Sequence, residues 1–421
     1  MDTRAFLQKV KPISPYQFAA FRIGLGAYLL VHLANLIPYG AELFSHQGTL
    51  PRPQLNFTYG ILPNPLEHWD SPPVVTAFLA AMIFLAAAYT AGFYRRTSAL
   101  LLWYGWACLF NRNNLISNPS IPYVGLLLLL SVLLPHGEPL SLGRRKEPSK
   151  WAFPATIYSV AWFLMAAGYT LSGTIKLSSP SWVDGTALVH LLNNPLARPG
   201  VFRDIFLASP EWAIRLQTWA VLALEILFLP LSMTRITRSL AWLSMVLMHL
   251  SILLVVDFAD LSFGMLMVHL FTFDPAWLPP RRGERARLLV LFDGVCGLCD
   301  RTVGFLTEED RLTLLRFAPL QGATAASILQ RHPEIEVDSK TIILVRGYNT
   351  PNETLALRSE AVLCALDELG GIWRVVSWLR VVPAIVRDAV YDWVARNRYR
   401  WFGKYAECRI PTPGSQDQFL P

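Results

Sequence analysis

Long runs of apolar residues constrain this chain more than any other feature of its sequence. They carry few charges and lie in its first two thirds, at residues 17–38, 73–93, 98–110, 122–134, 151–171, 216–232, 240–256 and 261–273. A helix needs about 20 mostly apolar residues to cross a bilayer, with some variation for tilt. The runs therefore predict a polytopic α-helical membrane domain of about eight spans over residues 1–280, although the third and fourth runs are short.

The overall composition also indicates a membrane protein. Hydrophobic residues make up 53% of the 421 residues and charged residues only 16%, and the mean hydropathy is +0.36. A soluble globule of this length is less apolar. The net charge of +7 does not indicate a nucleic-acid partner, because the basic residues form short clusters between the apolar runs.

These basic clusters also predict a topology. Loops rich in Lys and Arg stay on the cytosolic side. Here they precede the first run and follow the second, fourth, sixth and eighth: Arg4, Lys9, Lys11, Arg95, Arg96, Arg144, Arg145, Lys146, Lys150, Arg235, Arg238, Arg281, Arg282, Arg285 and Arg287. We therefore expect a multi-pass protein of the cell (inner) membrane with both termini in the cytosol. Residues 40–72, 111–121 and 176–215 would face outside, although the last stretch also holds three arginines. No small-residue cleavage pattern follows the first run, so we expect a retained helix rather than a signal peptide.

After residue 280 the pattern changes to that of a soluble α/β domain, which we expect over residues 281–421. Short apolar strands are predicted at 288–292, 312–317 and 341–345, and helices at 297–306, 323–330 and 359–369. A Trp-rich, basic segment follows at 372–404.

A C-x-x-C pair, Cys296 and Cys299, stands where the first of these strands meets its helix. Backbone N–H groups and the helix dipole stabilise a thiolate at a helix N-terminus. We expect Cys296 to be the exposed nucleophile and Cys299 the resolving thiol. The acids Asp293 and Asp300 oppose a thiolate and Arg301 favours one, and Asp293 is placed to exchange a proton with Cys299.

Zinc binding and inert structural cysteines are the alternatives for this pair. Zinc takes four nitrogen or sulfur ligands, and beyond the pair only the isolated Cys364, Cys408 and His332 remain. The sequence therefore favours redox chemistry and predicts no metal site.

The motif Asp293-Gly-Val-Cys296-Gly-Leu-Cys299-Asp300 resembles the signature of the DCC family of thiol–disulfide oxidoreductases. The ending from Arg387 to Lys404 resembles the C-terminal signature of that family, so the resemblance covers about residues 288–410. It implies a thioredoxin-like fold. One departure is that Arg358-Ser359 stands where thioredoxins carry a cis-proline, which puts the handling of protein disulfides in doubt.

Ionisable residues inside the apolar runs are candidates for function, since they are costly in a bilayer. They are Arg22, His32, Glu225, His249 and His269. The structural alternative is an ion pair between Arg22 and Glu225, with each histidine held by hydrogen bonds.

The stretch from Tyr169 to Gly185 holds a lysine, Lys176, followed by a turn with Trp182 and Asp184. It resembles the vitamin K-dependent γ-carboxylase family and its bacterial relatives, the HTTM domains, over about residues 15–279. The resemblance implies that Lys176 is the base in hydroquinone oxygenation. An apolar rim removes hydration and favours the neutral amine that a base requires. The alternative is a lysine that reaches to the interface.

Two departures make protein γ-carboxylation improbable. The Asn-rich stretch at residues 111–118 lacks the histidine of the carboxylases, and their large extracellular domain has no counterpart here. We expect a membrane-bound redox enzyme that couples a domain for a lipophilic substrate to a cytosolic thiol–disulfide domain. Its partners would be a membrane lipid or a quinone or hydroquinone, and a thiol or disulfide in the cytosol. A lipid-binding or scaffold protein with a redox sensor, and a thiol-gated transporter, are the alternatives.

Overall fold

The computed structural model describes residues 13–142, 151–280, 288–333, 335, 341–406 and 416–421. The chain forms two compact units, Met1–Phe273 and Asp274–Pro421. Cys408 and many of the basic residues behind the predicted topology lie outside the described residues: Arg4, Lys9, Lys11, Arg144, Arg145, Lys146, Lys150, Arg281, Arg282, Arg285 and Arg287.

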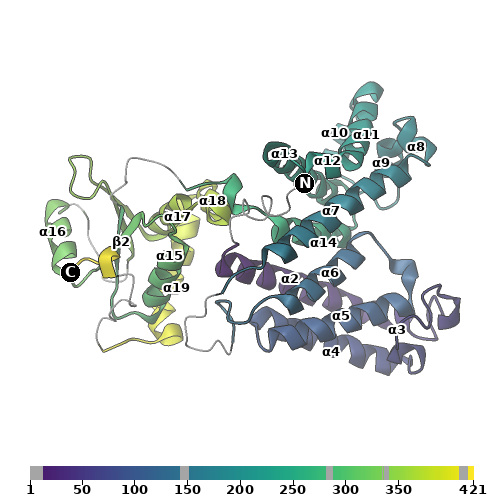
Figure 1. Ribbon diagram of the computed structural model, residues 1–421, viewed down its shortest axis with the longest axis horizontal. Coiled ribbons are helices and arrows are strands. Elements are labelled where there is room, and N and C mark those ends of the chain that lie inside the picture. The colour runs from purple at the N-terminus through teal and green to yellow at the C-terminus, as the bar shows by residue number, and fades with distance from the viewer. Residues whose placement is uncertain (1–12, 143–150, 281–287, 334, 336–340, 407–415) are drawn as a thin grey trace. The chain divides into compact units, whose positions relative to one another are not determined.

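The first unit is built of helices, which Figure 1 labels. They are α2 (Pro15–Leu36), α3 (Gly40–Phe44), α4 (Pro72–Ala91), α5 (Arg95–Arg112), α6 (Ser120–Leu133), α7 (Ala155–Lys176), α8 (Pro180–Val183), α9 (Ala187–Leu192), α10 (Val201–Leu207), α11 (Glu211–Ile226), α12 (Phe228–Leu231), α13 (Arg235–Val255) and α14 (Ala259–Thr272). Every apolar run in the sequence is therefore mainly helical. Local signals fix some helix ends: the Ser14 hydroxyl accepts from the N–H of Gln17 at 2.9 Å, and Pro15 opens α2.

Three segments of the described chain are long and apolar enough to cross a membrane: Pro15–Phe44, Pro72–Ala91 and Arg235–Val255. The expected count of about eight spans is therefore not confirmed. Helices α6 and α14 are apolar but have only 14 residues, which is about 21 Å at 1.5 Å per residue. Helix α5 carries three arginines, and α11 has 16 residues with two glutamates and an arginine.

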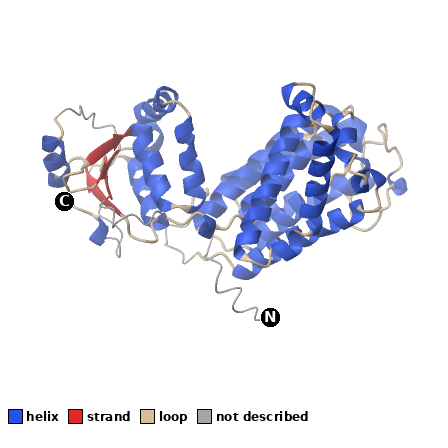
Figure 2. Cartoon of the chain, turned by 90° about the horizontal axis from the view of Figure 1, so that it is seen from above, coloured by secondary structure: helices blue, strands red, loops and turns tan. Residues whose placement is uncertain are grey.

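The second unit contains a four-stranded mixed sheet with the order β2-β1-β3-β4. Strand β1 (Leu288–Phe292) pairs in parallel with β2 (Leu315–Pro319) and antiparallel with β3 (Ile343–Arg346), which pairs antiparallel with β4 (Thr354–Leu357). The helices are α15 (Gly297–Glu309), α16 (Ala323–Arg331), α17 (Arg358–Leu369), α18 (Gly371–Ser377) and α19 (Ala384–Phe402). Figure 2 shows the sheet in red with helices on both sides.

All five residues of β1 are buried, because helices cover both faces of the strand. Leu288, Val290 and Phe292 pack with α15 and α17. Leu289 and Leu291 pack with Ala325 and Ile328 of α16 on the other face. The cysteine pair thus stands at the end of the central buried strand.

The predicted strand at 288–292 and the helix that starts after Cys296 are confirmed. The predicted strand at 312–317 is displaced, since β2 begins at Leu315 after a turn that is closed by Asp310. Strand β4 was not predicted.

Candidate functional sites

The first candidate site is a cavity of about 550 Å³ in the helical unit. Helices α7, α11 and α13 supply most of its polar side chains, among them Tyr169, Lys176, Glu225 and His249. The rest of the lining is largely aliphatic and aromatic, with Trp182 from α8. A cavity of this size with a few convergent polar groups has the character of a small-molecule site.

Lys176, the last residue of α7, is held inside this cavity by Glu225 of α11. Its ammonium lies 2.5 Å from both carboxylate oxygens of Glu225 and 4.5 Å from the centre of the Trp182 ring. The hydroxyl of Ser172 donates to the same carboxylate at 3.2 Å. Only 23% of the Lys176 side chain and 5% of the Glu225 side chain is exposed, so the charges neutralise each other away from bulk water.

A second polar group lies deeper, where Tyr169 joins two histidines. Its hydroxyl is 2.9 Å from Nε2 of His249 and 2.9 Å from Nε2 of His269. The hydroxyl has one proton, so it donates to one imidazole and accepts from the other. The Nδ1 atoms of both rings have no hydrogen-bond partner among the described residues. Sequence reasoning named both histidines but not the tyrosine that connects them.

Two of the expected site residues lie elsewhere. The carboxylate of Asp184 accepts from the N–H of Thr186 at 2.9 Å and from its hydroxyl at 2.6 Å, and Asp184 does not line the cavity. Arg22 pairs with Glu138, at 3.6 Å, instead of Glu225. The ion pair considered between Arg22 and Glu225 is therefore not formed.

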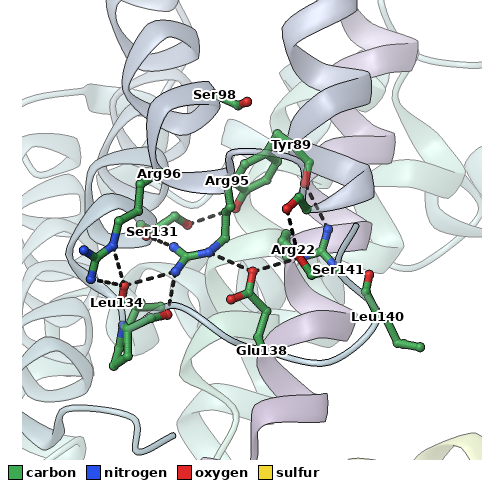
Figure 3. A network of polar contacts seen from close by, with 12 residues as sticks. Arg22, Tyr89, Arg95, Arg96, Ser98, Ser131, Leu134, Glu138, Leu140 and Ser141 are labelled. Carbon is green, nitrogen blue, oxygen red and sulfur yellow. Dashed lines mark hydrogen bonds and ion pairs between the residues drawn. The ribbon is translucent and has the colours of Figure 1, made fainter. Parts of the chain in front are cut away.

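Arg22 belongs to a buried structural network, which Figure 3 shows. Its guanidinium donates to the carbonyls of Tyr89 at 3.0 Å and of Leu140 at 2.6 Å. Arg95 approaches Glu138 at 2.8 Å and donates to the carbonyl of Pro135 at 2.6 Å. The network ties α2, the α4–α5 turn and the segment after α6 together.

The second candidate site is the C-x-x-C loop. Cys296 is the N-cap of α15, and its sulfur accepts a hydrogen bond from the N–H of Cys299 at 3.4 Å. The hydrogen bond between the two side chains lowers the pKa of Cys296 to about 6, with help from backbone N–H groups and Arg398 and against burial. The same interaction and burial raise the pKa of Cys299. The structure therefore favours a thiolate on Cys296, which the flanking charges in the sequence could not decide.

Asp293 lies beside the pair, and its carboxylate is occupied by four donors. Gln321 Nε2 lies 3.0 Å and the N–H of Val295 3.3 Å from one oxygen, while Arg398 Nη2 and the Tyr399 hydroxyl each lie 2.5 Å from the other. Burial raises the pKa of Asp293, but the hydrogen bonds and Arg398 outweigh it, and the pKa lies below its usual value. These contacts keep the Asp293 carboxylate negatively charged, so they favour a fixed charge over proton exchange with Cys299.

Cys296 is fully buried and Cys299 is only partly buried. The expectation of an exposed Cys296 was therefore wrong. The segment that follows α19 explains the burial. Cys296 forms an antiparallel bridge with Lys404, the N–H of Gly297 donates to the carbonyl of Gly403 at 3.2 Å, and the N–H of Tyr405 donates to the carbonyl of Val295 at 2.8 Å. We call Gly403–Lys404–Tyr405 the C-terminal strap.

Metal ligation is a separate question for this pair. Within the described ranges, no three or more His, Cys, Asp or Glu side chains gather in a way that could hold a metal ion. His332 instead lies 3.2 Å from Glu353, and Cys364 is buried in α17.

Two family profiles match the chain, one for each unit. The HTTM domain matches residues 10–277, and the DCC1-like thiol-disulfide oxidoreductase matches residues 290–404. The uncharacterized protein YuxK of Bacillus subtilis is 37% identical over 32% of this chain and 93% of its own length. A chloroplastic DCC family protein of Arabidopsis thaliana is 34% identical over 30% of this chain and 72% of its own length. No solved structure matches the chain significantly.

Proposed function

Because this chain belongs to the HTTM family and carries a DCC-family domain, we propose that it is a membrane-bound thiol–disulfide oxidoreductase with a second, lipophilic site. The observation that supports the redox activity most directly is the Cys296 sulfur at the N-terminus of α15, with its hydrogen bond from Cys299 N–H. The parallel β1–α15–β2 unit followed by an antiparallel hairpin and α17 supports a thioredoxin-like fold.

The thiol reaction has two steps. The Cys296 thiolate attacks one sulfur of a substrate disulfide, the substrate S–S bond breaks, and the leaving thiolate takes a proton from solvent. The Cys299 thiol then loses its proton and attacks the Cys296 sulfur, which releases the second substrate thiol. The substrate gains two electrons and the pair becomes a disulfide. Run in reverse, the same steps oxidise a dithiol.

Asp293 is a positioning residue in this proposal. Its fixed negative charge holds Arg398 and the Tyr399 hydroxyl beside the pair, and Arg398 in turn favours the Cys296 thiolate. The neutral Gln321 supports this arrangement, because its amide group donates to Asp293 at 3.0 Å and its oxygen accepts from the N–H of Gly294 at 3.2 Å.

In the HTTM unit, the cavity around Lys176 would take a quinol or another lipophilic substrate. The apolar lining suits the body of such a molecule, and Lys176, His249 and Tyr169 supply the polar contacts. A base role for Lys176 would require its ammonium to lose a proton first, and the Glu225 carboxylate, 2.5 Å away, is the acceptor within reach.

Trapping experiments on the full chain in detergent test the thiol activity. With Cys299→Ser the mixed disulfide with a small aromatic disulfide should persist on Cys296, and with Cys296→Ser little adduct should form. Equal trapping on both cysteines, or about one equivalent of bound zinc, would contradict the assignment.

Extraction tests the lipophilic site. Organic extraction of the purified protein should release a quinone or lipid, and Lys176→Met should lower its amount at least several-fold. Equal amounts from both proteins would remove Lys176 from the site.

The topology is tested on intact cells. With both termini cytosolic, a membrane-impermeant thiol reagent should label Cys299 only after lysis, and labelling of intact cells would reverse the proposed orientation.

A further inference from the structure

A second cavity, of about 340 Å³, lies in the HTTM unit and shares no lining residue with the cavity around Lys176. Helix α2, the end of α5 and the start of α14 form its walls. Most of the lining is aromatic or aliphatic, including Phe44, Trp106 and Phe263. Its volume falls in the range of small-molecule sites.

The polar part of this cavity is a histidine–aspartate pair. Nδ1 of His32 lies 2.6 Å from Oδ1 of Asp260. The Tyr28 hydroxyl donates to the same oxygen at 2.6 Å, and the amide of Asn118 donates to the other oxygen at 2.9 Å. The side chains of His32 and Asp260 are only 18% and 21% exposed. The carboxylate is fixed by donors from two segments of the chain, α2 and the stretch before α6.

This arrangement determines what the imidazole offers to a ligand. In the neutral imidazole, a carboxylate at Nδ1 keeps the proton on that nitrogen and leaves a lone pair on Nε2. The ring lies between Trp106, with centres 5.0 Å apart, and Tyr28, at 5.8 Å. None of the described residues donates a hydrogen bond to Nε2 of His32. Nε2 is therefore a hydrogen-bond acceptor without a donor in an apolar cavity. A ligand with a single hydroxyl group would supply that donor.

Apolar side chains that line this cavity are also exposed, as expected for a site that a ligand enters from the bilayer. Val31 of α2 and Phe263 of α14 line the cavity and are also 62% and 45% exposed, so they reach the surface of the unit. Helix α2 belongs to one of the three segments able to cross a membrane. A hydrophobic molecule in the bilayer would therefore meet apolar side chains at the entrance.

We propose that this cavity binds an apolar molecule with one hydroxyl group, and that the hydroxyl donates to Nε2 of His32. The ligand chemistry is that of a phenol or of a long-chain lipid alcohol. The site is additional to the Lys176 cavity and does not depend on the function proposed there.

Photoaffinity probes on the full chain in lipid nanodiscs test the site. Three probes carry the same diazirine-bearing isoprenoid tail and differ in the head: a phenol, its methyl ether and a primary alcohol. Peptide mapping should find the phenol probe, the alcohol probe or both on residues that line the second cavity, and the methyl ether should label them at least ten-fold less. The more efficient of the two hydroxyl probes identifies the ligand source. Equal labelling by the ether and the hydroxyl probes would overturn the proposal, since hydrophobic partition alone would then explain it.

Variants separate this site from the Lys176 cavity. His32→Leu replaces the imidazole with an apolar side chain of similar size and should reduce labelling by the hydroxyl probes to the level of the ether. Asp260→Asn should weaken it less, because the amide can still hold the ring. Lys176→Met should leave this labelling unchanged even where it lowers the recovery of quinone or lipid. Wild-type labelling of His32→Leu would overturn the proposal, and if that variant fails to fold, the comparison of ether and phenol on the wild-type protein decides.

Discussion

At the scale of single residues, the acidity of Cys296 depends mainly on its neighbour Cys299. The pKa of about 6 leaves about nine-tenths of Cys296 as thiolate at pH 7, against about 1% for a thiol of pKa 9. The rate at which iodoacetamide alkylates Cys296 should therefore fall as the pH drops through about 6. An ordinary thiol would already lose reactivity as the pH drops through about 9.

The same measurement on variants identifies the cause. Cys299→Ala removes the donor, so the midpoint should move up by more than one pH unit. Cys299→Ser keeps a hydroxyl donor and should stay nearer the wild-type midpoint. An unchanged midpoint in Cys299→Ala would assign the acidity to the helix N-terminus and Arg398 alone.

Tyr169 carries a second prediction at this scale. Tyr169→Phe leaves Nε2 of both His249 and His269 without the hydroxyl that joins them, and a buried polar group without a partner costs about 1–3 kcal/mol. Thermal unfolding of the purified protein in detergent should therefore begin at a lower temperature. Tyr123→Phe is the matched control, because its hydroxyl makes only one long bond, 3.4 Å to the carbonyl of Leu164. Equal effects in both variants would mean that the bridge adds no stability.

At the scale of elements, two glycines of α15 should respond in opposite ways to alanine. A Cβ at Gly297 would collide with the carbonyl oxygen of Phe402, whereas a Cβ at Gly304 would meet nothing within 4 Å. Gly304→Ala should stabilise the domain by about 0.5–1 kcal/mol, since alanine is the better helix former. Gly297→Ala should lower the stability and expose Cys296. Chemical denaturation with thiol labelling checks both, and similar stabilities for the two variants would show that Phe402 can move away.

The elements also show what the sequence could predict. Strand β1 and helix α15 were found because an apolar strand and a C-x-x-C leave strong local signals. Strand β4 has four residues, none fully buried, so it has little apolar pattern. The partners of Asp293 were missed for another reason: Arg398 and Tyr399 lie 105 and 106 residues along the chain, and their signature gave no hint of the contact.

At the scale of the HTTM unit, Glu138 is the one carboxylate in the network of Figure 3. It is 2% exposed and lies between Arg22 and Arg95. Glu138→Gln removes only its charge and leaves two buried guanidinium groups uncompensated, which costs about 3–5 kcal/mol. Loss of folded protein in detergent, followed by size-exclusion chromatography, should reveal this.

Glu211→Gln is the control for that variant. Glu211 pairs with Arg215 on the surface of α11 at 2.7 Å, and an exposed pair four residues apart contributes only about 0.3–0.5 kcal/mol. Equal yields of folded protein from both variants would contradict a structural role for the network. The number of spans predicted from the apolar runs was too high because α5 carries three arginines, and α6 and α14 have only 14 residues each.

The C-terminal strap gives the thiol site a kinetic property. Cys296 is closed off while Gly403 and Tyr405 remain bonded to Gly297 and Val295, so a reagent can reach it only during brief openings. At low reagent concentration the labelling rate should report how often the strap is open, and at high concentration it should level off at the rate of opening itself. Cys299, which is partly exposed, should show no such plateau. The strap would then act as a gate whose opening rate, and not the nucleophilicity of the sulfur, limits how fast the domain can exchange electrons.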